Sequence, residues 1–189
     1  MLQAAVAQLV FVRFGAGQSR VGQTAESAMA ILKGLPVTTM RDIVGEAWEG
    51  VLRPLVYREA LDLIASHAAR GEPTYIVSGA LQEIVDGLAH ELGLDGGVGS
   101  RAEVANGIYT GRLERRLYGP DKVDALEELA SAESLDLASS TGYSDSFTDL
   151  TFLEAVGHPV AINPDRALRE VARERGWPVR RFRTKAFPR

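Results

Sequence analysis

Segments with helical periodicity alternate with short apolar segments from Pro54 onward, and this alternation is the feature that most constrains the fold. A helical stripe in 55–70 is followed by the apolar run TYIVS at 74–78 and then by a second helical stripe in 81–92. Helices and strands that alternate in this way form a mostly parallel sheet with helices on both faces. The sequence therefore predicts an α/β fold.

The same alternation continues toward the C-terminal end. Asn106 and Gly107 are the turn residues of a predicted hairpin in 97–114, because this dipeptide favours tight hairpin turns. Gly119 and Pro120 open the next predicted helix, since proline suits the first helical turn. The remaining predicted elements are a strand near 136–143, a helix from about 147, a strand at 159–163, a helix at 165–175 and a strand at 179–183.

The first part of the chain has a different pattern, without a clear alternating strand. Its Ala-rich, amphipathic runs at 2–14, 24–33 and 39–53 are separated by turn-like segments. We therefore expect a small helical unit at 1–53 and an α/β core at 54–189.

Composition excludes several classes of chemistry and partner. The sequence has no cysteine, so disulfides, thiolate metal sites and cysteine nucleophiles are excluded. No segment is long enough to span a bilayer, and the apolar N-terminal run lacks the basic start of a signal peptide, so we expect a cytoplasmic protein without a membrane partner. From residue 161 onward nine Lys or Arg stand against three Asp or Glu. This basic end lacks a recognised nucleic-acid motif and is expected to be a solvated helix face and a loose terminus.

Ser78 is the first candidate site residue, because it ends the predicted strand at 74–78 and precedes Gly79 and a helix. Ligands of open parallel sheets bind beyond the carboxyl ends of the strands. The Ser78 hydroxyl and the following N–H groups could thus hold an anion at a helix N-terminus. Serine is also an ordinary helix cap, and for this residue alone the cap is the better interpretation.

Lys122 lies in the first turn of its predicted helix, where the helix dipole disfavours a cation. One interpretation is that its ammonium group points at an anionic ligand. The commoner situation is a solvated lysine balanced by Asp121 and Asp124.

Asp145 and Asp149 are the strongest pair, one helical turn apart where a predicted strand leads into a helix. Two hard oxygen ligands suit Mg²⁺, which completes its octahedron with water and phosphate oxygens. Alternatively, Asp145 or Ser146 caps the helix and Asp149 favours its dipole. Spacing alone leaves both interpretations open.

Histidine and tryptophan residues give no further site in the sequence. The three histidines lack metal-ligand spacing: His67 and His90 are expected at the surface, and His158 in a turn before a proline. Trp48 and Trp177 are expected to pack in the interior.

Four segments in order resemble the phosphoserine-phosphatase-like branch of the haloacid dehalogenase superfamily, and the resemblance runs from about Leu52 to the end of the chain. They are IVSGALQEIVDGLAHELGLD, NGIYTGRLE, YGPDKVDALEELA and YSDSFTDLTFLEAVGHPVAINPD. The resemblance implies a Rossmann-like core. It also implies that the helical first part is the tail end of the small helical cap that these enzymes insert after their first motif.

The resemblance assigns a role to each candidate. Ser78, with Gly79 beside it, matches the second-motif position that binds the transferring phosphoryl group. Lys122 matches the lysine that neutralises charge on that group and on the nucleophile. Asp145 matches the carboxylate that binds Mg²⁺ directly, and Asp149 matches the second acid, which supports the metal site through water or holds the lysine. These roles agree with the positioning and charge neutralisation that phosphoryl transfer requires.

The first motif of the family is missing from this sequence. These enzymes begin with an apolar strand ending in Asp-x-Asp-x-Thr, whose first aspartate is the nucleophile and whose second is the general acid and base. No Asp-x-Asp occurs in the 189 residues. In the family this strand lies between the strand that ends at Ser78 and the strand that leads to Asp145, so its loss is expected to leave two strand edges unpaired.

Three explanations are open for the missing motif. The chain is a shortened version of an active phosphatase, which the retained lysine and metal carboxylates favour. It is a phosphatase-derived binding or regulatory module without catalysis. Or another segment, such as LVFVRF at 9–14, fills the gap.

The resemblance implies that the full activity is Mg²⁺-dependent hydrolysis of a small phosphomonoester, with phosphoserine as one candidate substrate. Little or no turnover is expected of the 189-residue chain itself. The expected partner is a small phosphorylated metabolite, and an incomplete sheet would also allow strand exchange between copies in a homo-oligomer.

Overall fold

The computed structural model of the protein describes residues 29–187. Its first sheet has the strand order β1-β2-β3, with β1 at Tyr75–Leu81, β2 at Gly96–Ala105 and β3 at Ile108–Arg115. β1 and β2 are parallel, whereas β2 and β3 are antiparallel. Asn106 and Gly107 connect the latter pair with positive φ angles of 52° and 77°. The predicted hairpin and its turn are therefore confirmed.

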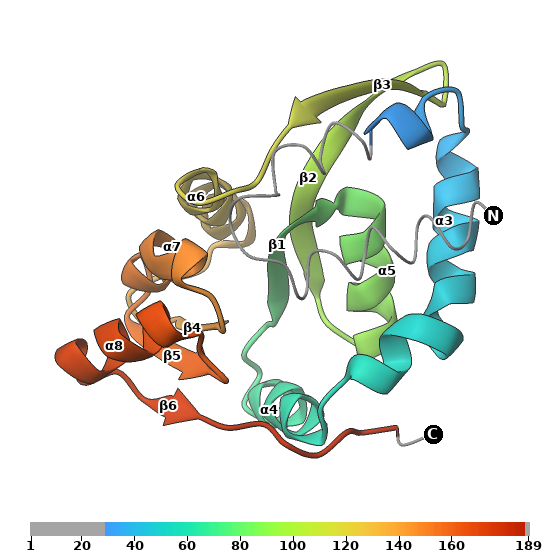
Figure 1. The fold of residues 1–189 in the computed structure, drawn as a ribbon. Helices are drawn as coiled ribbons and strands as arrows, with labels where there is room; N and C mark the ends of the chain where they lie inside the picture. Colours follow the sequence, from blue (N-terminus) through green and yellow to red (C-terminus); the bar gives the residue numbers. More distant parts are fainter. Residues whose placement is uncertain (1–28, 188–189) are drawn as a thin grey trace.

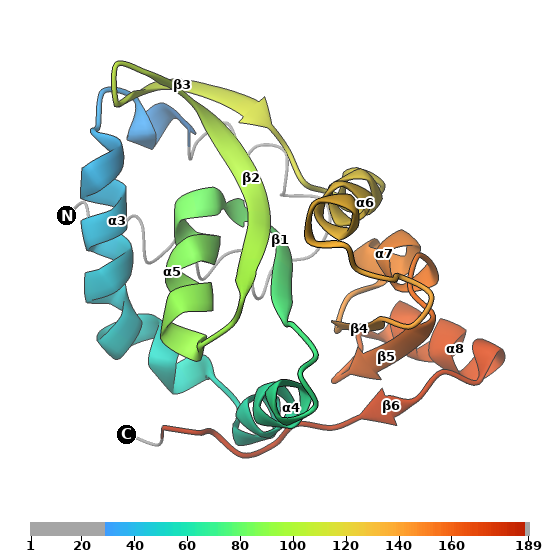
Figure 2. The same cartoon turned by 180° about the vertical axis from the view of Figure 1, so that it is seen from behind.

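Helices lie on both sides of this sheet (Figures 1 and 2). α5 (Gln82–Leu92) packs against β1 and β2, and α3 (Val37–Ala47) packs on α5. α6 (Asp121–Glu133) lies on the opposite side and contacts the same two strands. After α3 the chain passes through one π-helical turn, η2 (Trp48–Leu52), and one 3₁₀ turn, η3 (Arg53–Leu55).

A second sheet has the order β4-β5-β6 and is entirely parallel. Its strands are β4 (Thr141–Ser144), β5 (His158–Ile162) and β6 (Val179–Arg180). The 3₁₀ turn η4 (Phe147–Asp149) and α7 (Leu150–Glu154) connect β4 to β5, and α8 (Arg166–Arg175) connects β5 to β6. The predicted alternation of helices and strands is confirmed in this half of the core.

The parallel sheet is split between β1 and β4. The strand orders make β1 an edge of the first sheet and β4 an edge of the second. Within residues 29–187 no strand pairs with the free side of either one. Figures 1 and 2 show the second sheet beyond the β1 edge of the first. Two unpaired edges are the consequence expected when the family's central strand is absent.

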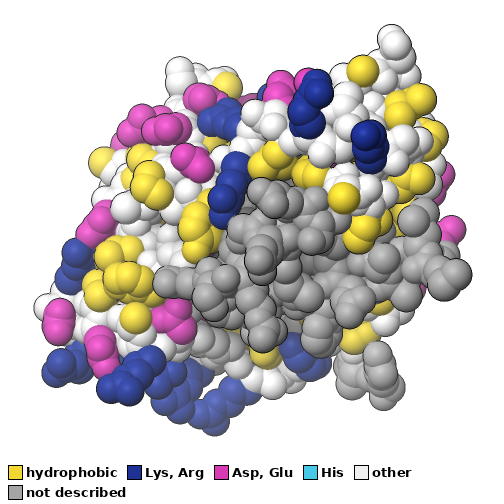
Figure 3. All heavy atoms as spheres, turned by 45° about the horizontal axis from the view of Figure 1, so that its top comes forward, with side chains coloured by type: hydrophobic (Ala, Val, Ile, Leu, Met, Phe, Trp, Pro, Cys, Tyr) yellow, Lys and Arg dark blue, Asp and Glu magenta, His cyan; other side chains and the backbone are white. Residues whose placement is uncertain are grey.

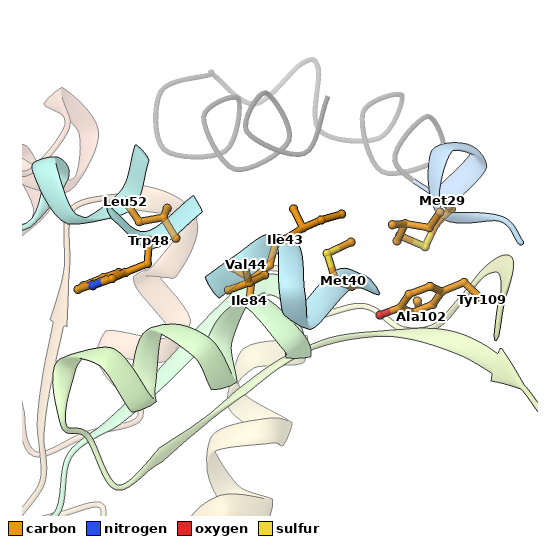
Figure 4. Packing of buried hydrophobic residues seen from close by; sticks show 10 residues of the cluster. Met29, Met40, Ile43, Val44, Trp48, Leu52, Ile84, Ala102 and Tyr109 are labelled. Carbon is orange, nitrogen blue, oxygen red and sulfur yellow. The ribbon is translucent and has the colours of Figure 1, made fainter. Parts of the chain in front are cut away.

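The main hydrophobic core lies between α3 and the first sheet (Figure 4). Trp48 is 8% exposed there, so its predicted packing role is confirmed. Val44 approaches α5 closely, since a Cβ at Gly87 would lie 2.5 Å from its Cγ1. The buried members of this cluster are Met29, Leu32, Met40, Ile43, Val44, Trp48, Leu52, Ile84, Ala102 and Tyr109. A smaller cluster under α8 consists of Leu153, Ala161, Leu168 and Ala172, with Trp177 packed against it.

The start of α4 (Arg58–Ala69) is tied to the C-terminal segment. The Arg58 N–H donates to the Thr184 carbonyl at 2.8 Å, and Tyr57 forms an isolated antiparallel bridge with Lys185. None of the residues of α4 is buried. Its predicted apolar stripe is thus only partly covered by the described part of the chain: Leu61 and Ile64 are half-buried, and Ala65 and Ala68 are exposed.

The basic C-terminal end lies on the surface, as the sequence predicts. Figure 3 shows Lys and Arg side chains, with acidic ones among them, at the corner where Figure 1 places α8 and β6. Arg166 and Glu170 form an exposed i,i+4 ion pair on α8, and Arg175 pairs with Glu154 of α7. This arrangement is a solvated helix face with local charge pairing.

Three local predictions were wrong. The strand near 136–143 begins only at Thr141, because Asp136 accepts hydrogen bonds from the hydroxyls of Ser139 and Ser140 and holds a turn there. His158 is the first residue of β5, not a turn residue. β1 continues to Leu81, so Ser78 is not its last residue. The predicted helix at 2–14 and the segment LVFVRF lie outside the described residues.

Candidate active site

Ser78 lies in an irregular part of β1. Val77 is opposite Val98 and Leu81 is opposite Ser100, so β1 advances four residues where β2 advances two. The Ser78 hydroxyl oxygen accepts a hydrogen bond from the Ala80 N–H at 3.1 Å, inside the resulting bulge. The N-cap position of α5 is Leu81, without a side-chain cap. The helix-cap interpretation of Ser78 is therefore wrong, and among residues 29–187 its hydroxyl group acts only as an acceptor.

Lys122 and Asp149 form a salt bridge between α6 and the start of α7. Lys122 Nζ lies 2.5 Å from Asp149 Oδ1, and the two side chains are only 12% and 16% exposed. The expectation of a solvated lysine balanced by its own neighbours is therefore wrong. The sheltered ammonium group is directed at the carboxylate that follows β4.

Ser144 and Ser146 complete the turn around Asp149. The Ser144 hydroxyl donates to Asp149 Oδ2 at 2.8 Å and accepts from the Ser146 N–H at 3.2 Å. Ser146 is the N-cap of η4, because its hydroxyl accepts from the Thr148 N–H. Both oxygens of Asp149 are thus occupied by donors, which fixes the carboxylate in one orientation.

Asp145 follows β4 directly, and the residue as a whole is exposed. Surrounding protein atoms nevertheless desolvate its carboxyl group and raise its pKa, and the charges of Asp149 and Asp165 raise it further. Its own backbone hydrogen bond and Lys122 act in the opposite direction. The net effect is a raised pKa, so the negative charge of Asp145 is only partly compensated by protein groups.

Asp165 holds the loop after β5 against the loop after β4. Its carboxylate accepts from the Leu168 N–H at 2.8 Å as the N-cap of α8, and from the Phe147 N–H at 2.8 Å. Its own N–H donates to the Asp145 carbonyl at 2.8 Å. Asp165 therefore sets the backbone position of Asp145.

The donor set at this corner fits a hard divalent cation. Asp145 supplies one carboxylate, and Mg²⁺ commonly takes one or two from a protein. Asp149, whose two oxygens already accept from Lys122 and Ser144, would support such a site through water. The negative charge of Asp145 is only partly compensated by protein groups, and a bound cation would compensate it further. Within residues 29–187 no cluster of three or more acidic or histidine side chains could coordinate a metal with protein ligands alone. A metal held here would keep positions for water and phosphate oxygens.

The expectation that His67 lies at the surface was also wrong. Its side chain is 14% exposed and not on the open surface. The Nε2 atom lies 2.8 Å from the Tyr143 hydroxyl of β4, and the Nδ1 atom lies 2.6 Å from Glu72 Oε2. His67 thus links the end of α4 to the strand that leads to Asp145. His90 and His158 are exposed, and for His90 this agrees with the prediction.

The structure brings together three of the five predicted site residues, namely Lys122, Asp145 and Asp149, around the end of β4. Ser78 lies on β1, which α6 also contacts. The sequence interpretation missed Ser144 and Asp165. A signal for Asp165 was present, because an aspartate just before a helical stripe is a common N-cap.

Comparison with known proteins gives the family. A profile described as haloacid dehalogenase-like hydrolase matches residues 2–154. A probable phosphatase of Mycobacterium tuberculosis is 40% identical over 182 residues, which is 96% of this chain and 63% of the relative. A phosphoserine phosphatase of the same organism is 37% identical over 157 residues, or 82% of this chain and 51% of the relative.

A similar solved structure is a protein of unknown function from Bordetella pertussis Tohama I. It has a TM-score of 0.78 and 29% sequence identity, and the match covers 92% of this chain and 79% of that one. In the two comparisons with Mycobacterium tuberculosis proteins, by contrast, the chain spans less than two thirds of the length of the relative. The matched profile covers most of its 189 residues. The chain belongs to the haloacid dehalogenase-like hydrolase family, in its phosphoserine-phosphatase-like branch.

Proposed function

We propose that the full protein is a Mg²⁺-dependent phosphatase that acts on a small phosphorylated metabolite in the cytoplasm, with phosphoserine as one candidate substrate. The observation that carries this proposal is the sheltered Lys122–Asp149 salt bridge beside the poorly compensated carboxylate of Asp145. A lysine and two acids in this arrangement have the charges needed at a phosphoryl-transfer site.

Each residue has a role in this proposal. The Ser78 hydroxyl and the backbone at Gly79 bind oxygens of the phosphoryl group. Lys122 neutralises charge that develops on those oxygens, while Asp149 holds its ammonium group in place. Asp145 would hold Mg²⁺, with Asp149 supporting the site, and the bound metal would neutralise further phosphate charge.

We propose that the nucleophile and the general acid come from a strand that lies outside this 189-residue sequence. Two observations support this: the sequence contains no Asp-x-Asp, and β1 and β4 both have a free edge in the described part of the chain. One additional parallel strand would join the two sheets and bring its last residues to the end of β4. In this proposal residues 1–53 are part of the cap and 54–189 are the rest of the core.

The test is an assay of phosphate release from phosphoserine by an extended chain, in which an apolar strand ending in Asp-x-Asp-x-Thr precedes the present sequence. We expect turnover in Mg²⁺, and its loss in EDTA and in the Asp145→Asn variant. Asp121→Asn is the matched control, because Asp121 is an exposed acid on α6. Full activity of the Asp145→Asn variant would show that the assignment of the site is wrong.

A second candidate function is a phosphate- or metal-binding module without catalysis, which the missing Asp-x-Asp favours. Under this alternative inorganic phosphate or Mg²⁺ stabilises the 189-residue chain by binding its folded state. A rise in the thermal unfolding midpoint with either ligand, lost in Lys122→Met or Asp145→Asn, would support it. An unchanged midpoint with both ligands would reject it.

A further inference from the structure

Ser100 is the only buried polar residue among residues 29–187, with 4% of its surface exposed. Its hydroxyl donates to the Gly79 carbonyl at 3.0 Å and accepts from the Leu117 N–H at 3.0 Å. A buried hydroxyl with both functions occupied is fixed in position, since either lost bond would leave a buried backbone group unpaired.

The two partners of Ser100 belong to the two sides of the proposed phosphoryl site. Gly79 follows Ser78 in the bulge of β1. Leu117 is fully buried and lies in the short connection between β3 and α6, where the Gly119 carbonyl accepts from the Lys122 N–H at 3.1 Å. One hydroxyl group therefore joins the Ser78 turn to the segment that places Lys122.

A second side chain supports the bulge from its other end. The Gln82 amide accepts from the Gly99 N–H at 2.7 Å and donates to the Gly97 carbonyl at 3.0 Å. An amide side chain has a donor and an acceptor in one plane, so it bonds the backbone of β2 as a peptide group of a neighbouring strand would. A Cβ at Gly99 would lie 2.8 Å from the Ala80 carbonyl oxygen, so only glycine leaves room for this packing.

We infer that Ser100 is a positioning residue that fixes the distance between the Ser78–Gly79 turn and Lys122. This inference rests on the proposed phosphatase function, because it assigns to Ser100 the alignment of the two groups that contact the phosphoryl group. Both groups act on charge that grows in the transition state, so their misalignment lowers kcat more than it raises KM.

The test uses the extended, active chain and compares Ser100→Ala with Ala172→Gly. Ala172 is fully buried in α8, and glycine there weakens the helix without a role in the site. Both variants are assayed below their unfolding midpoints. We expect Ser100→Ala to lower kcat at least tenfold with a smaller change in KM, whereas Ala172→Gly keeps both constants close to the wild-type values.

Equal kinetic constants in Ser100→Ala and Ala172→Gly would overturn the inference and leave the proposed function intact. If the wild-type extended chain releases no phosphate, the proposed function fails and the inference fails with it. If Ser100→Ala does not fold, Ser100→Cys decides, because a thiol keeps the shape but is a weak donor. A several-fold lower kcat in Ser100→Cys supports the inference, and a wild-type kcat overturns it.

Discussion

Lys122 and Asp149 are 27 residues apart in the sequence, yet the Lys122 ammonium nitrogen lies 2.5 Å from a carboxylate oxygen of Asp149. Both side chains are largely sheltered from solvent. The Ser144 hydroxyl holds the second oxygen of the carboxylate. This pair connects α6 to the segment after β4, so it has a structural role as well as its proposed role in phosphate binding.

Removal of one partner of this pair is expected to be costly. Lys122→Met leaves the Asp149 carboxylate without its main counter-charge, which typically lowers the free energy of unfolding by about 3 kcal/mol for a sheltered pair. The double variant Lys122→Met with Asp149→Leu should recover much of that loss, since no uncompensated charge remains. Urea unfolding of the single and double variants measures the difference. If the double variant loses as much unfolding free energy as the two single variants together, the two side chains do not stabilise each other and the prediction is wrong.

Asp165 offers a matched test of its capping role. Asp165→Ala removes the acceptor for the Leu168 and Phe147 N–H groups, and should lower the free energy of unfolding by about 1–2 kcal/mol. In Asp165→Asn the amide oxygen can still accept from the Leu168 N–H, but the NH₂ group cannot accept from the Phe147 N–H, so this variant should lose less stability than Asp165→Ala. Chemical denaturation of both variants decides the point. The same loss in both variants would contradict the capping role, because the amide oxygen of asparagine can still accept from the Leu168 N–H.

Gly157 and Gly45 should respond to alanine in opposite ways. A Cβ at Gly157 would lie 1.6 Å from the Ala138 carbonyl oxygen, and the Gly157 N–H already donates to Leu137 at 2.9 Å, so neither backbone segment can move freely. We expect Gly157→Ala to lower the free energy of unfolding by about 2 kcal/mol or more. Gly45 lies in α3 with open space around it, and Gly45→Ala should raise stability by up to about 1 kcal/mol. Thermal unfolding of the two variants checks both signs.

The lowered pKa of Glu72 predicts that the free energy of unfolding depends on pH in the acid range. Hydrogen bonds from Arg70 and then His67 lower the pKa of Glu72 from 4.5 to about 2. Because the folded-state pKa is depressed, this stabilisation is fully present above about pH 4.5 and is lost as the pH falls toward 2. The unfolding midpoint of the Glu72→Gln variant should therefore fall less steeply than that of the wild type over this range. Parallel midpoint curves for the two proteins would contradict the prediction.

The sequence predicts local structure well where turn chemistry decides it. Asn106 and Gly107 both tolerate positive φ, and the hairpin forms at that dipeptide. The start of β4 was misplaced because 136–140 forms a turn: the Asp136 carboxylate accepts from the Ala138 N–H, and the Asp136 carbonyl accepts from the Ser139 hydroxyl. Local side-chain hydrogen bonds can overrule an apolar pattern.

The site was only partly predictable for a different reason. Spacing identified Asp145 and Asp149 as a pair, but the partner of Lys122 depends on how α6 packs beside α7, which no local pattern encodes. The same holds for His67, whose contact with Tyr143 joins elements 76 residues apart. Ser100 was missed because its hydrogen-bond partners are backbone groups of distant segments. Tertiary contacts of this kind become visible only in the folded chain.

The most direct test of the account is a side-by-side measurement of phosphate release from phosphoserine in Mg²⁺ by the 189-residue chain and by the extended chain carrying Asp-x-Asp-x-Thr. We predict release by the extended chain and little or none by the 189-residue chain, which has the proposed phosphate and metal ligands but no Asp-x-Asp. Robust hydrolysis by the 189-residue chain that is abolished by Asp145→Asn would contradict the account of the missing strand.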